Sequence, residues 1–234
     1  LVTVCEFCRT IVGRADKNVE DHGKVADLIE THSPIHIGLA GKYQKKRFEV
    51  VGRVQYQHPA GGVWNEWYLQ FPGDKVGWLA EAQGKFYLMF ERRFPSEAEL
   101  PTFDELVVGD RFQSAPTGKG PLLSGAGFVV AEKGIATAHA ADGDIPWAFR
   151  QNAEHRFADL HGDKDEFGTF EFSGDRPRGF FGREVALDEL NLESDGWSAA
   201  APVATGSGAL QVNCPHCAGP LTLHAPDQTQ RDRK

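Results

Sequence analysis

The stretch VWNEWYLQF at residues 63–71 decides the fold that this sequence predicts. Its side chains alternate between two sides, as they do in a β-strand, where successive residues point to opposite faces of a sheet. One side carries Asn65, Trp67, Leu69 and Phe71, and the other carries Trp64, Glu66, Tyr68 and Gln70. The first side is predicted to face a hydrophobic core.

Strand patterns continue around this stretch. Between residues 35 and 94 the segments HIGLAG, RFEVVGRVQYQ, VGWLAEA and KFYLMFE are separated by HPAGG, PGDK and QG. Glycine and proline supply the backbone angles that hairpin turns need. Residues 35–94 are therefore predicted to form an antiparallel meander that closes into a sandwich or a small barrel.

A second unit with a similar succession follows. An acidic connector at 95–107 leads to residues 108–192, which contain the strand patterns GFVVAEKGIATAHA, RFADL, GTFEF and GFFGREVAL. Setting FEVVGRVQY beside FVVAEKGIA indicates a degenerate duplication. The predicted fold class is mostly β, with two related antiparallel β-units of small barrel or sandwich type in tandem. The alternative is one larger sandwich without a repeat.

Shorter segments frame the two units. Residues 1–13 are predicted to form a knuckle, which is a tight turn that carries two thiols, and residues 212–234 a second knuckle with a polar tail. Residues 14–34 are predicted to form a helical linker, because apolar residues at helical spacing precede a proline. Residues 193–211 are rich in serine, alanine, glycine and proline, which is typical of a flexible linker.

The four cysteines form two Cys-x-x-Cys pairs at opposite ends of the chain. Zinc prefers four tetrahedral ligands, and two thiolates at this spacing can bind one ion because the turn between them points both sulfurs inward. Each pair supplies half of such a site. The predicted metal ligands are Cys5, Cys8, Cys214 and Cys217, and the predicted cofactor is a structural zinc ion.

Three interpretations of these pairs stay open. The four thiolates could form one clasp that joins the two ends, since domain termini often lie close together. Each pair could instead belong to a separate ribbon whose partner pair lies outside this sequence. Unmetallated or redox-active pairs are disfavoured, because redox pairs normally precede a helix in a βαβ unit. His224 in the polar tail is a conceivable further ligand.

Trp64, Glu66, Tyr68 and Trp78 are a candidate ligand-binding set. An aromatic and acidic surface can hold a cationic ligand by cation–π contact and a counter-charge. The same side chains could line a barrel or fill the seam between the two β-units. We favour the seam, because large aromatic residues usually serve burial.

The segment EHRFADLHGDKDE is the other candidate site. Its residues His155, Asp159, His161, Asp163 and Asp165 could bind a divalent cation or supply an acid and a base. Aspartate and glycine also dominate turns for backbone reasons. We therefore favour an acidic β-turn for this segment.

Composition and motifs narrow the range of functions. The formal net charge of -8 disfavours nucleic acid and anionic lipid as partners. No apolar run reaches the length of a membrane span and no signal peptide is evident, so a cytoplasmic location is expected. The sequence lacks a phosphate-binding loop, a dinucleotide fingerprint and a hydrolase elbow, so an enzyme is disfavoured.

From GRVQYQHPAGGVWNEWYLQF to FFGREVALDELNL the sequence resembles a bacterial family catalogued as domain of unknown function 4178. The W-N-E-W and G-W-L pieces are the most specific parts of the resemblance. It implies one zinc ribbon before the β-rich region and another after it, which favours two separate ribbons. The resemblance also implies that Arg9 and Ala218 stand where a knuckle ordinarily has glycine. As a separate point, it offers a link to membrane stress or polyamine metabolism.

These observations predict a non-enzymatic binding or scaffold protein with structural zinc and a protein partner that docks on the ribbons. One alternative is a metal-dependent hydrolase that uses His155, His161 and nearby carboxylates. Another is a sensor of a cationic small molecule such as a polyamine.

Overall fold

The computed structural model describes residues 2–15, 18–96, 98, 100–112, 127–147, 149–193 and 210–223. The predicted flexible linker at 193–211 lies outside these ranges except at its two ends. His224 lies outside them as well.

Nearly all regular structure in the described residues is β-strand. The strands are β1 (Val2–Val4), β2 (Thr10–Ala15), β3 (Asn18–Lys24), β4 (Ala40–Tyr43), β5 (Lys46–Gln57), β6 (Val63–Phe71), β7 (Lys75–Ala82), β8 (Lys85–Arg92), β9 (Arg111–Phe112), β10 (Phe128–Ile145), β11 (Glu154–His161), β12 (Glu166–Glu171), β13 (Arg178–Val185), β14 (Leu210–Asn213) and β15 (Pro220–Leu223). One short 3-10 helix, η1 (Leu187–Leu190), follows β13.

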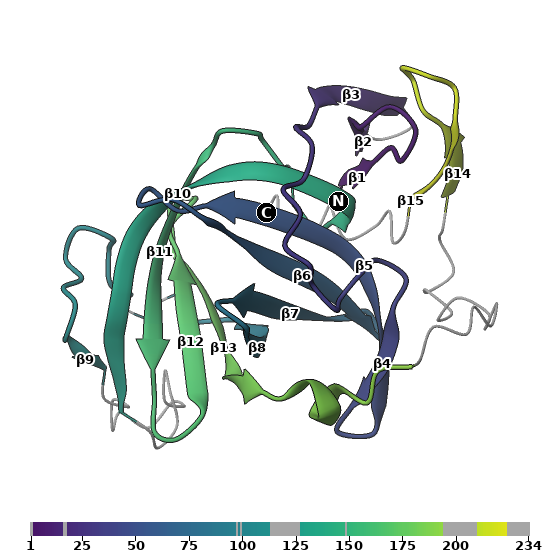
Figure 1. The fold of residues 1–234 in the computed structure, drawn as a ribbon. Helices are drawn as coiled ribbons and strands as arrows, with labels where there is room; N and C mark the ends of the chain where they lie inside the picture. Colours follow the sequence, from purple (N-terminus) through teal and green to yellow (C-terminus); the bar gives the residue numbers. More distant parts are fainter. Residues whose placement is uncertain are drawn as a thin grey trace.

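Eight of these strands close into an antiparallel barrel (Figure 1). Their order is β10-β11-β12-β13-β8-β7-β6-β5, and β5 pairs in turn with β10. The predicted mostly β, antiparallel fold class is confirmed.

The two predicted β-units supply four barrel strands each. Strands β5 to β8 come from residues 35–94, and β10 to β13 come from residues 108–192. The halves join where β13 pairs with β8 and where β10 pairs with β5, so they form a single barrel together. That the halves are related by duplication stays a prediction.

Both faces of strand β6 in the barrel wall are buried, which explains why this strand is rich in large apolar residues. The outward side of β6 carries Trp67, Leu69 and Phe71, which pack in one hydrophobic cluster with Phe48 and Leu88. The inward side carries Tyr68, which packs with Trp78, Met89, Phe167 and Phe180. The alternation predicted for residues 63–71 thus separates an outer core from the barrel interior.

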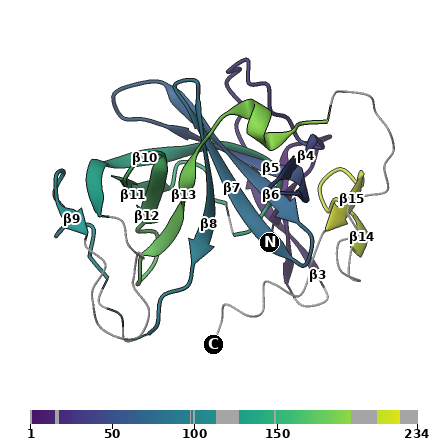
Figure 2. The ribbon, with the colours of Figure 1, turned by 90° about the horizontal axis from the view of Figure 1, so that it is seen from below.

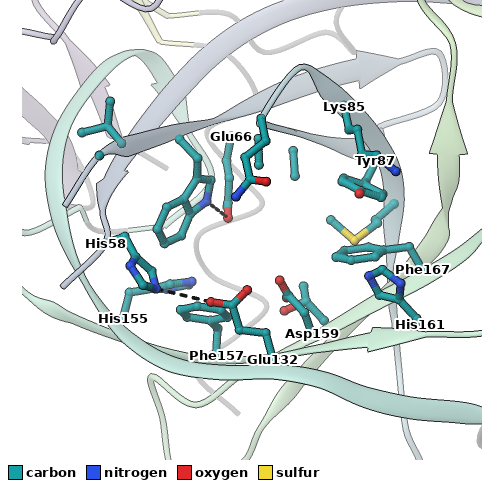
Figure 3. Close-up of a pocket in the computed structure, with 18 of the residues that line it drawn as sticks. His58, Glu66, Lys85, Tyr87, Glu132, His155, Phe157, Asp159, His161 and Phe167 are labelled. Atoms are coloured by element: carbon teal, nitrogen blue, oxygen red, sulfur yellow. Dashed lines mark hydrogen bonds and ion pairs between the residues drawn. The ribbon is translucent and has the colours of Figure 1, made fainter. Parts of the chain in front are cut away.

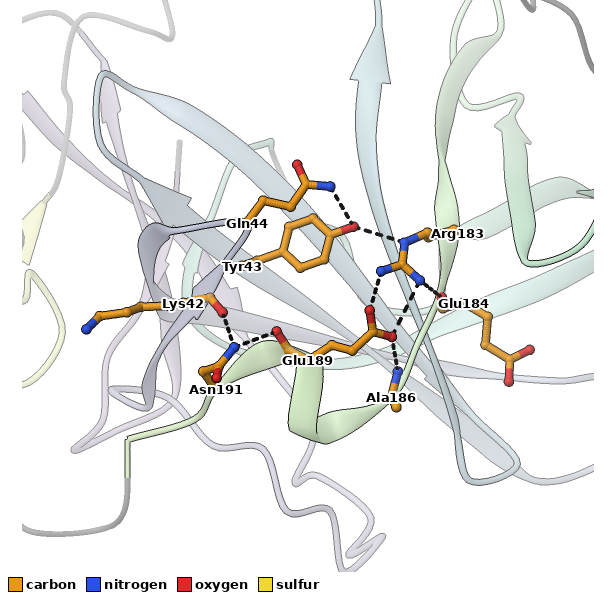
Figure 4. A network of polar contacts seen from close by, with 8 residues as sticks. All are labelled: Lys42, Tyr43, Gln44, Arg183, Glu184, Ala186, Glu189 and Asn191. Carbon is orange, nitrogen blue, oxygen red and sulfur yellow. Dashed lines mark hydrogen bonds and ion pairs between the residues drawn. The ribbon is translucent and has the colours of Figure 1, made fainter.

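The outer core is covered by β4 and by η1. Leu190 of η1 is fully buried in it. A polar network holds the cover in place: the Arg183 guanidinium donates to Glu189 and to the Tyr43 hydroxyl, and Asn191 Nδ2 donates to the Lys42 carbonyl at 3.3 Å (Figure 4). The short helix is therefore tied both to the barrel and to the β4 edge.

The prediction of a helical linker at 14–34 is wrong. Its first part is in β2 and β3, and its second part is extended. Buried side chains of the barrel bind the backbone of that extended part, since Gln55 exchanges two hydrogen bonds of 2.8 Å with the amide and carbonyl of Ile29. Asn65 Nδ2 also donates to Thr31 Oγ1 at 2.8 Å. These tertiary bonds replace the hydrogen bonds that a helix would make with itself.

The two ends of the chain form two small hairpin structures beside the barrel (Figures 1 and 2). At the front end β1 pairs with β10, and β2 and β3 extend the sheet from there. At the other end β14 and β15 form a separate two-stranded sheet.

A close approach of two glycines closes the barrel seam. Gly52 of β5 pairs with Gly143 of β10, and a Cβ on Gly52 would lie 2.0 Å from the Asp144 carbonyl oxygen. Only a glycine allows the two backbones to approach so closely, because an added methyl group would push the strands apart.

We expect Gly52→Ala to lower the free energy of unfolding by about 1–3 kcal/mol, the usual cost of forcing extra atoms into a packed region. Gly174→Ala is the control, since a Cβ there meets no atom nearer than 4.0 Å. Urea denaturation of both variants measures the difference. Equal stabilities would contradict the role of Gly52 in closing the barrel.

Candidate functional site

The four cysteines come together at the junction of the two end hairpins. Their sulfurs all lie within 4.8 Å of one another. Cys5 Sγ is 3.7 Å from Cys217 Sγ, and Cys8 Sγ is 3.6 Å from Cys214 Sγ. Each close pair therefore joins one thiol from each end of the chain, as the clasp interpretation requires.

The two Cys-x-x-Cys turns have the same backbone geometry. In the first, Cys5 N donates to the Thr10 carbonyl at 2.9 Å and Arg9 N donates to the Cys5 carbonyl at 2.9 Å. In the second, the Cys214 amide and the Cys214 carbonyl make the matching bonds, each 2.8 Å long, to Gly219 and Ala218. Such a turn aims both of its sulfurs at a common point.

Arg9 and Ala218 occupy the left-handed region of backbone space, with φ of 61° and 59°. Glycine is favoured there because it has no Cβ, which is the physical reason for the glycine that the family resemblance implies. Arg9 offsets the strain with tertiary contacts, since Nη1 lies 2.8 Å from Asp142 Oδ1 and Nη2 donates to the Ala141 carbonyl at 2.7 Å. The guanidinium thereby fixes the first knuckle to β10 of the barrel.

The cysteine cluster has the chemistry of a metal site. Cys5 and Cys214 are buried with Val12 and Leu221 in a small apolar cluster. The hydrogen bond between Cys8 Sγ and Thr10 Oγ1, 3.2 Å long, lowers the pKa of Cys8 to about 6, which favours its thiolate. Four thiolates around one point suit zinc. Among the described residues no other group of three or more potential ligands is close enough to hold an ion.

A second site lies inside the barrel, where a cavity of about 420 Å³ opens to solvent (Figure 3). Its rim includes the exposed residues Gly61 and Gly62 between β5 and β6, and Gln83 between β7 and β8. Its walls come from the inward sides of β6, β7, β8, β10, β11 and β12. The volume suits a small organic molecule.

Glu66 projects into this cavity from β6. It is only 7% exposed, and both of its oxygens are held by indoles: Trp64 Nε1 donates to Oε1 at 3.0 Å and Trp78 Nε1 donates to Oε2 at 2.5 Å. Burial and the nearby charge of Glu171 raise its pKa to about 8, against the opposing effect of the indole donors. The carboxyl group is thus fixed in position and poised to change its protonation near neutral pH.

Two ionisable groups stand on the facing wall, on β11. Burial raises the pKa of Asp159 to about 7, although Thr169 hydrogen-bonds it and opposes the shift. Burial lowers the pKa of His155 to about 4, so its imidazole is neutral at physiological pH. Figure 3 shows Glu66 and Asp159 pointing into the cavity from different sides.

The two candidate groups that the sequence presented separately thus meet in one cavity. Trp64 and Glu66 line it from β6, and His155, Asp159 and His161 line it from β11. Side chains alternate between the two faces of β11, so every second side chain of this strand lines the cavity. The acidic β-turn that we favoured for the segment EHRFADLHGDKDE is present only at the end of this segment.

That turn contains Asp163 and Asp165, which are exposed between β11 and β12. Tyr68 and Trp78 are not among the residues that line the cavity, and they pack in the inner hydrophobic cluster. The structure therefore places all four residues of the aromatic and acidic set on the barrel interior, as the lining alternative proposed, and not at a seam between separate units.

The inner side of the barrel wall also carries a polar group that the sequence analysis missed. Arg178 pairs with Glu91, with Nε 2.9 Å from Oε1, and its guanidinium lies 5.1 Å from the ring centroids of both Trp147 and Phe180. Buried Glu171 stands opposite Arg178 in the β12–β13 pair. Alternation places these residues on the inner side of their strands, but only barrel closure brings the strands together.

The aromatic lining was also missed in part. Tyr87 and Phe167 stack with ring centroids 4.2 Å apart, and Phe157 packs edge-on against Trp64 at 5.6 Å. Phe157 and Phe167 alternate with outward residues on β11 and β12, so the period of two was the signal that could have identified them.

Comparison with protein families gives a match over the barrel. The sequence profile described as Domain of unknown function (DUF4178) matches residues 36–187, which include all eight barrel strands. No curated protein and no solved structure matches the chain. In the described residues there is no helix with the length and apolar character of a membrane span.

The raised pKa of Asp159 predicts a pH dependence of stability. Folded Asp159 keeps its proton up to about pH 7, whereas an unfolded aspartate, with its usual pKa of 3.8, releases it. Raising the pH through this window therefore favours the unfolded chain, by up to about 1.4 kcal/mol per pH unit for this one group.

We expect Asp159→Asn to lose less stability as the pH rises, and to have a higher free energy of unfolding than the unsubstituted protein at pH 8. Urea denaturation at intervals from pH 4 to pH 8 measures it. Asp163→Asn, in the exposed turn, should leave the slope unchanged. An unaltered slope in Asp159→Asn would show that this carboxyl ionises normally in the folded protein.

Proposed function

We propose that this chain, which belongs to the DUF4178 family, is a non-enzymatic ligand-binding protein. Its barrel holds a small molecule in the interior cavity, and one structural zinc ion joins the two ends of the chain. The observation that carries the proposal is an open cavity whose polar groups are fixed on rigid strands, since binding sites are concave and have a few positioned polar groups.

A structural role for zinc is supported by the ligand set. Four thiolates fill a tetrahedral shell and leave no open position for a substrate or a water molecule. The cysteine cluster also joins hairpins at opposite ends of the sequence, whose described residues pack together in one small apolar cluster, so an ion there would stabilise their association. The ion would contribute to folding and not to a reaction.

A binding role for the cavity is supported by how its polar groups are engaged. The Glu66 oxygens each accept an indole hydrogen bond, and His155 is stacked on Tyr56 with ring centroids 4.1 Å apart. Neither is paired with a serine, cysteine or lysine among the cavity-lining residues, as a nucleophilic site would require. The arrangement can orient a bound molecule without an evident reaction.

An acid–base enzyme is the second candidate. It is favoured by one observation, which is that Asp159 and Glu66 have pKa values raised to about 7 and about 8 in one cavity. Perturbed carboxyl groups in a cleft are common in active sites. The metal dependence considered with the hydrolase lacks support, since the described cavity residues do not form a group of metal ligands.

The remaining expectations stay predictions. They are a protein partner docked on the cysteine hairpins, a cytoplasmic location, and a link to membrane stress or polyamine metabolism. Nucleic acid remains disfavoured because of the net charge of -8.

We expect the purified protein to contain one zinc ion per chain, measured by elemental analysis and native mass spectrometry. Removing zinc with a chelator should lower Tm, by about 2–4 °C for each kcal/mol that the ion contributes to a protein of this size. A protein that binds no zinc and melts unchanged would contradict the clasp.

Cys217→Ser provides the control for the chelator. Cys217 is exposed, so the substitution removes a ligand with little loss of packing. The variant should contain less zinc, melt at the temperature of the chelated protein, and no longer respond to chelator.

We expect the cavity to retain a small molecule during gentle purification. Native and denaturing mass spectrometry of the same sample would show a noncovalent component that Ala80→Phe abolishes, because Ala80 lines the cavity and a phenyl ring would fill it. An Ala80→Phe protein that folds, binds zinc and carries the same component would place the binding site elsewhere.

A further inference from the structure

We infer that the barrel cavity takes a small aliphatic amine, whose ammonium group lies between Glu66 and Asp159 and whose carbon chain lies against the aromatic walls. This inference rests on the proposed ligand-binding function and names the ligand class. It joins side chains of β6 and β11 that no sequence motif connects.

The charge of the lining favours a cation. Glu66, Asp159 and Glu132 line the cavity, whereas its one lysine, Lys85, is exposed and directs its ammonium to Glu184 at 2.9 Å. No arginine lines it. Buried carboxyl groups without a cationic neighbour are costly to ionise, and a ligand that brings a positive charge removes that cost.

The hydrogen-bonding capacity of the lining favours a cation with N–H groups. His155 is 7% exposed, and none of the described residues hydrogen-bonds its ring nitrogens. A neutral imidazole has one nitrogen that accepts a hydrogen bond. The carboxyl groups of Glu66 and Asp159 and the imidazole of His155 all line the cavity and supply acceptors for the N–H groups of an amine.

The aromatic walls suit the rest of such a molecule. Trp64 and Phe157 form one side, and the stacked pair Tyr87 and Phe167 forms the other. Ring faces attract a nearby ammonium, and they pack against methylene groups.

The rim of the cavity also favours a cationic ligand. His58 Nε2 lies 3.3 Å from Glu132 Oε1, so a polar contact spans the opening between β10 and the β5–β6 loop (Figure 3). Glu132 stays more than half exposed. A carboxylate at the entrance attracts cations and repels anions.

Two other ligand classes fit less well. An anion would meet the carboxyl groups without an arginine to bind it. A metal ion would require a cluster of ligand atoms, and in the described part of the chain only the cysteines provide one.

Calorimetric titration of the zinc-containing protein with three molecules of equal chain length tests the ligand class. The probes are 1,4-diaminobutane, 1,4-butanediol and succinate, which differ in charge and hydrogen bonding but share a four-carbon backbone. We expect saturable binding of the diamine, and at least about tenfold weaker binding of the diol and of succinate, because only the diamine pairs with the carboxyl groups.

Substitutions of the acidic residues test whether the diamine binds in the cavity. Glu66→Gln and Asp159→Asn should each weaken diamine binding by about tenfold or more, since each removes a counter-charge from the cavity. Glu132→Gln, at an exposed position on the rim, should weaken it by about threefold, as expected for an exposed charge. Glu193→Gln is the matched control, because Glu193 pairs with Arg47 on the outer surface, and it should bind like the unsubstituted protein.

The outcomes separate the ligand class from the wider proposal. Binding of the diol or succinate as strong as that of the diamine, abolished by Ala80→Phe, would overturn the amine assignment and leave the binding function intact. Diamine binding that survives both Asp159→Asn and Ala80→Phe would overturn the site. No binding of the diamine by the folded, zinc-containing protein would overturn the inference.

Discussion

The pairing of β5 with β10 is the constraint on which the other features depend. It turns two four-stranded meanders into a closed wall, and closure gives every strand an inner side with limited access to water. The seam requires the backbones to touch, which Gly52 and Gly143 permit. A barrel of eight strands leaves an interior just wide enough for side chains or one small ligand, and the cavity follows from that geometry.

The interior is unusual because it buries acids. Glu66, Asp159 and Glu171 all have raised pKa values, with burial as the main cause. An apolar lining of the same volume would make a more stable barrel, because buried ionisable groups cost free energy unless they are paired. Residues retained at a cost to stability are commonly functional. The same groups that weaken the fold at high pH are therefore those best placed to receive a ligand.

The cysteine cluster holds the C-terminal hairpin against the N-terminal one. The β14–β15 hairpin is a two-stranded sheet, and such a hairpin has little stability alone. In the described residues it packs on the front hairpin through a small cluster of Cys5, Val12, Cys214 and Leu221. A metal ion bound by all four thiols would add the free energy that this small contact lacks. Arg9 connects the cluster to the barrel through β10.

The sequence by itself determined the eight barrel strands, their antiparallel pairing within each half and the two cysteine turns, because alternation, turn residues and Cys-x-x-Cys spacing are local signals. It determined the candidate residues of both walls, but not that they face one another. Tertiary structure decided that, together with the extended path of the segment predicted to be helical, which Gln55 binds through its side chain. It also brought four sulfurs to one point. These features depend on contacts between residues far apart in the chain, and the periodicity of a single strand does not identify the strand across the barrel.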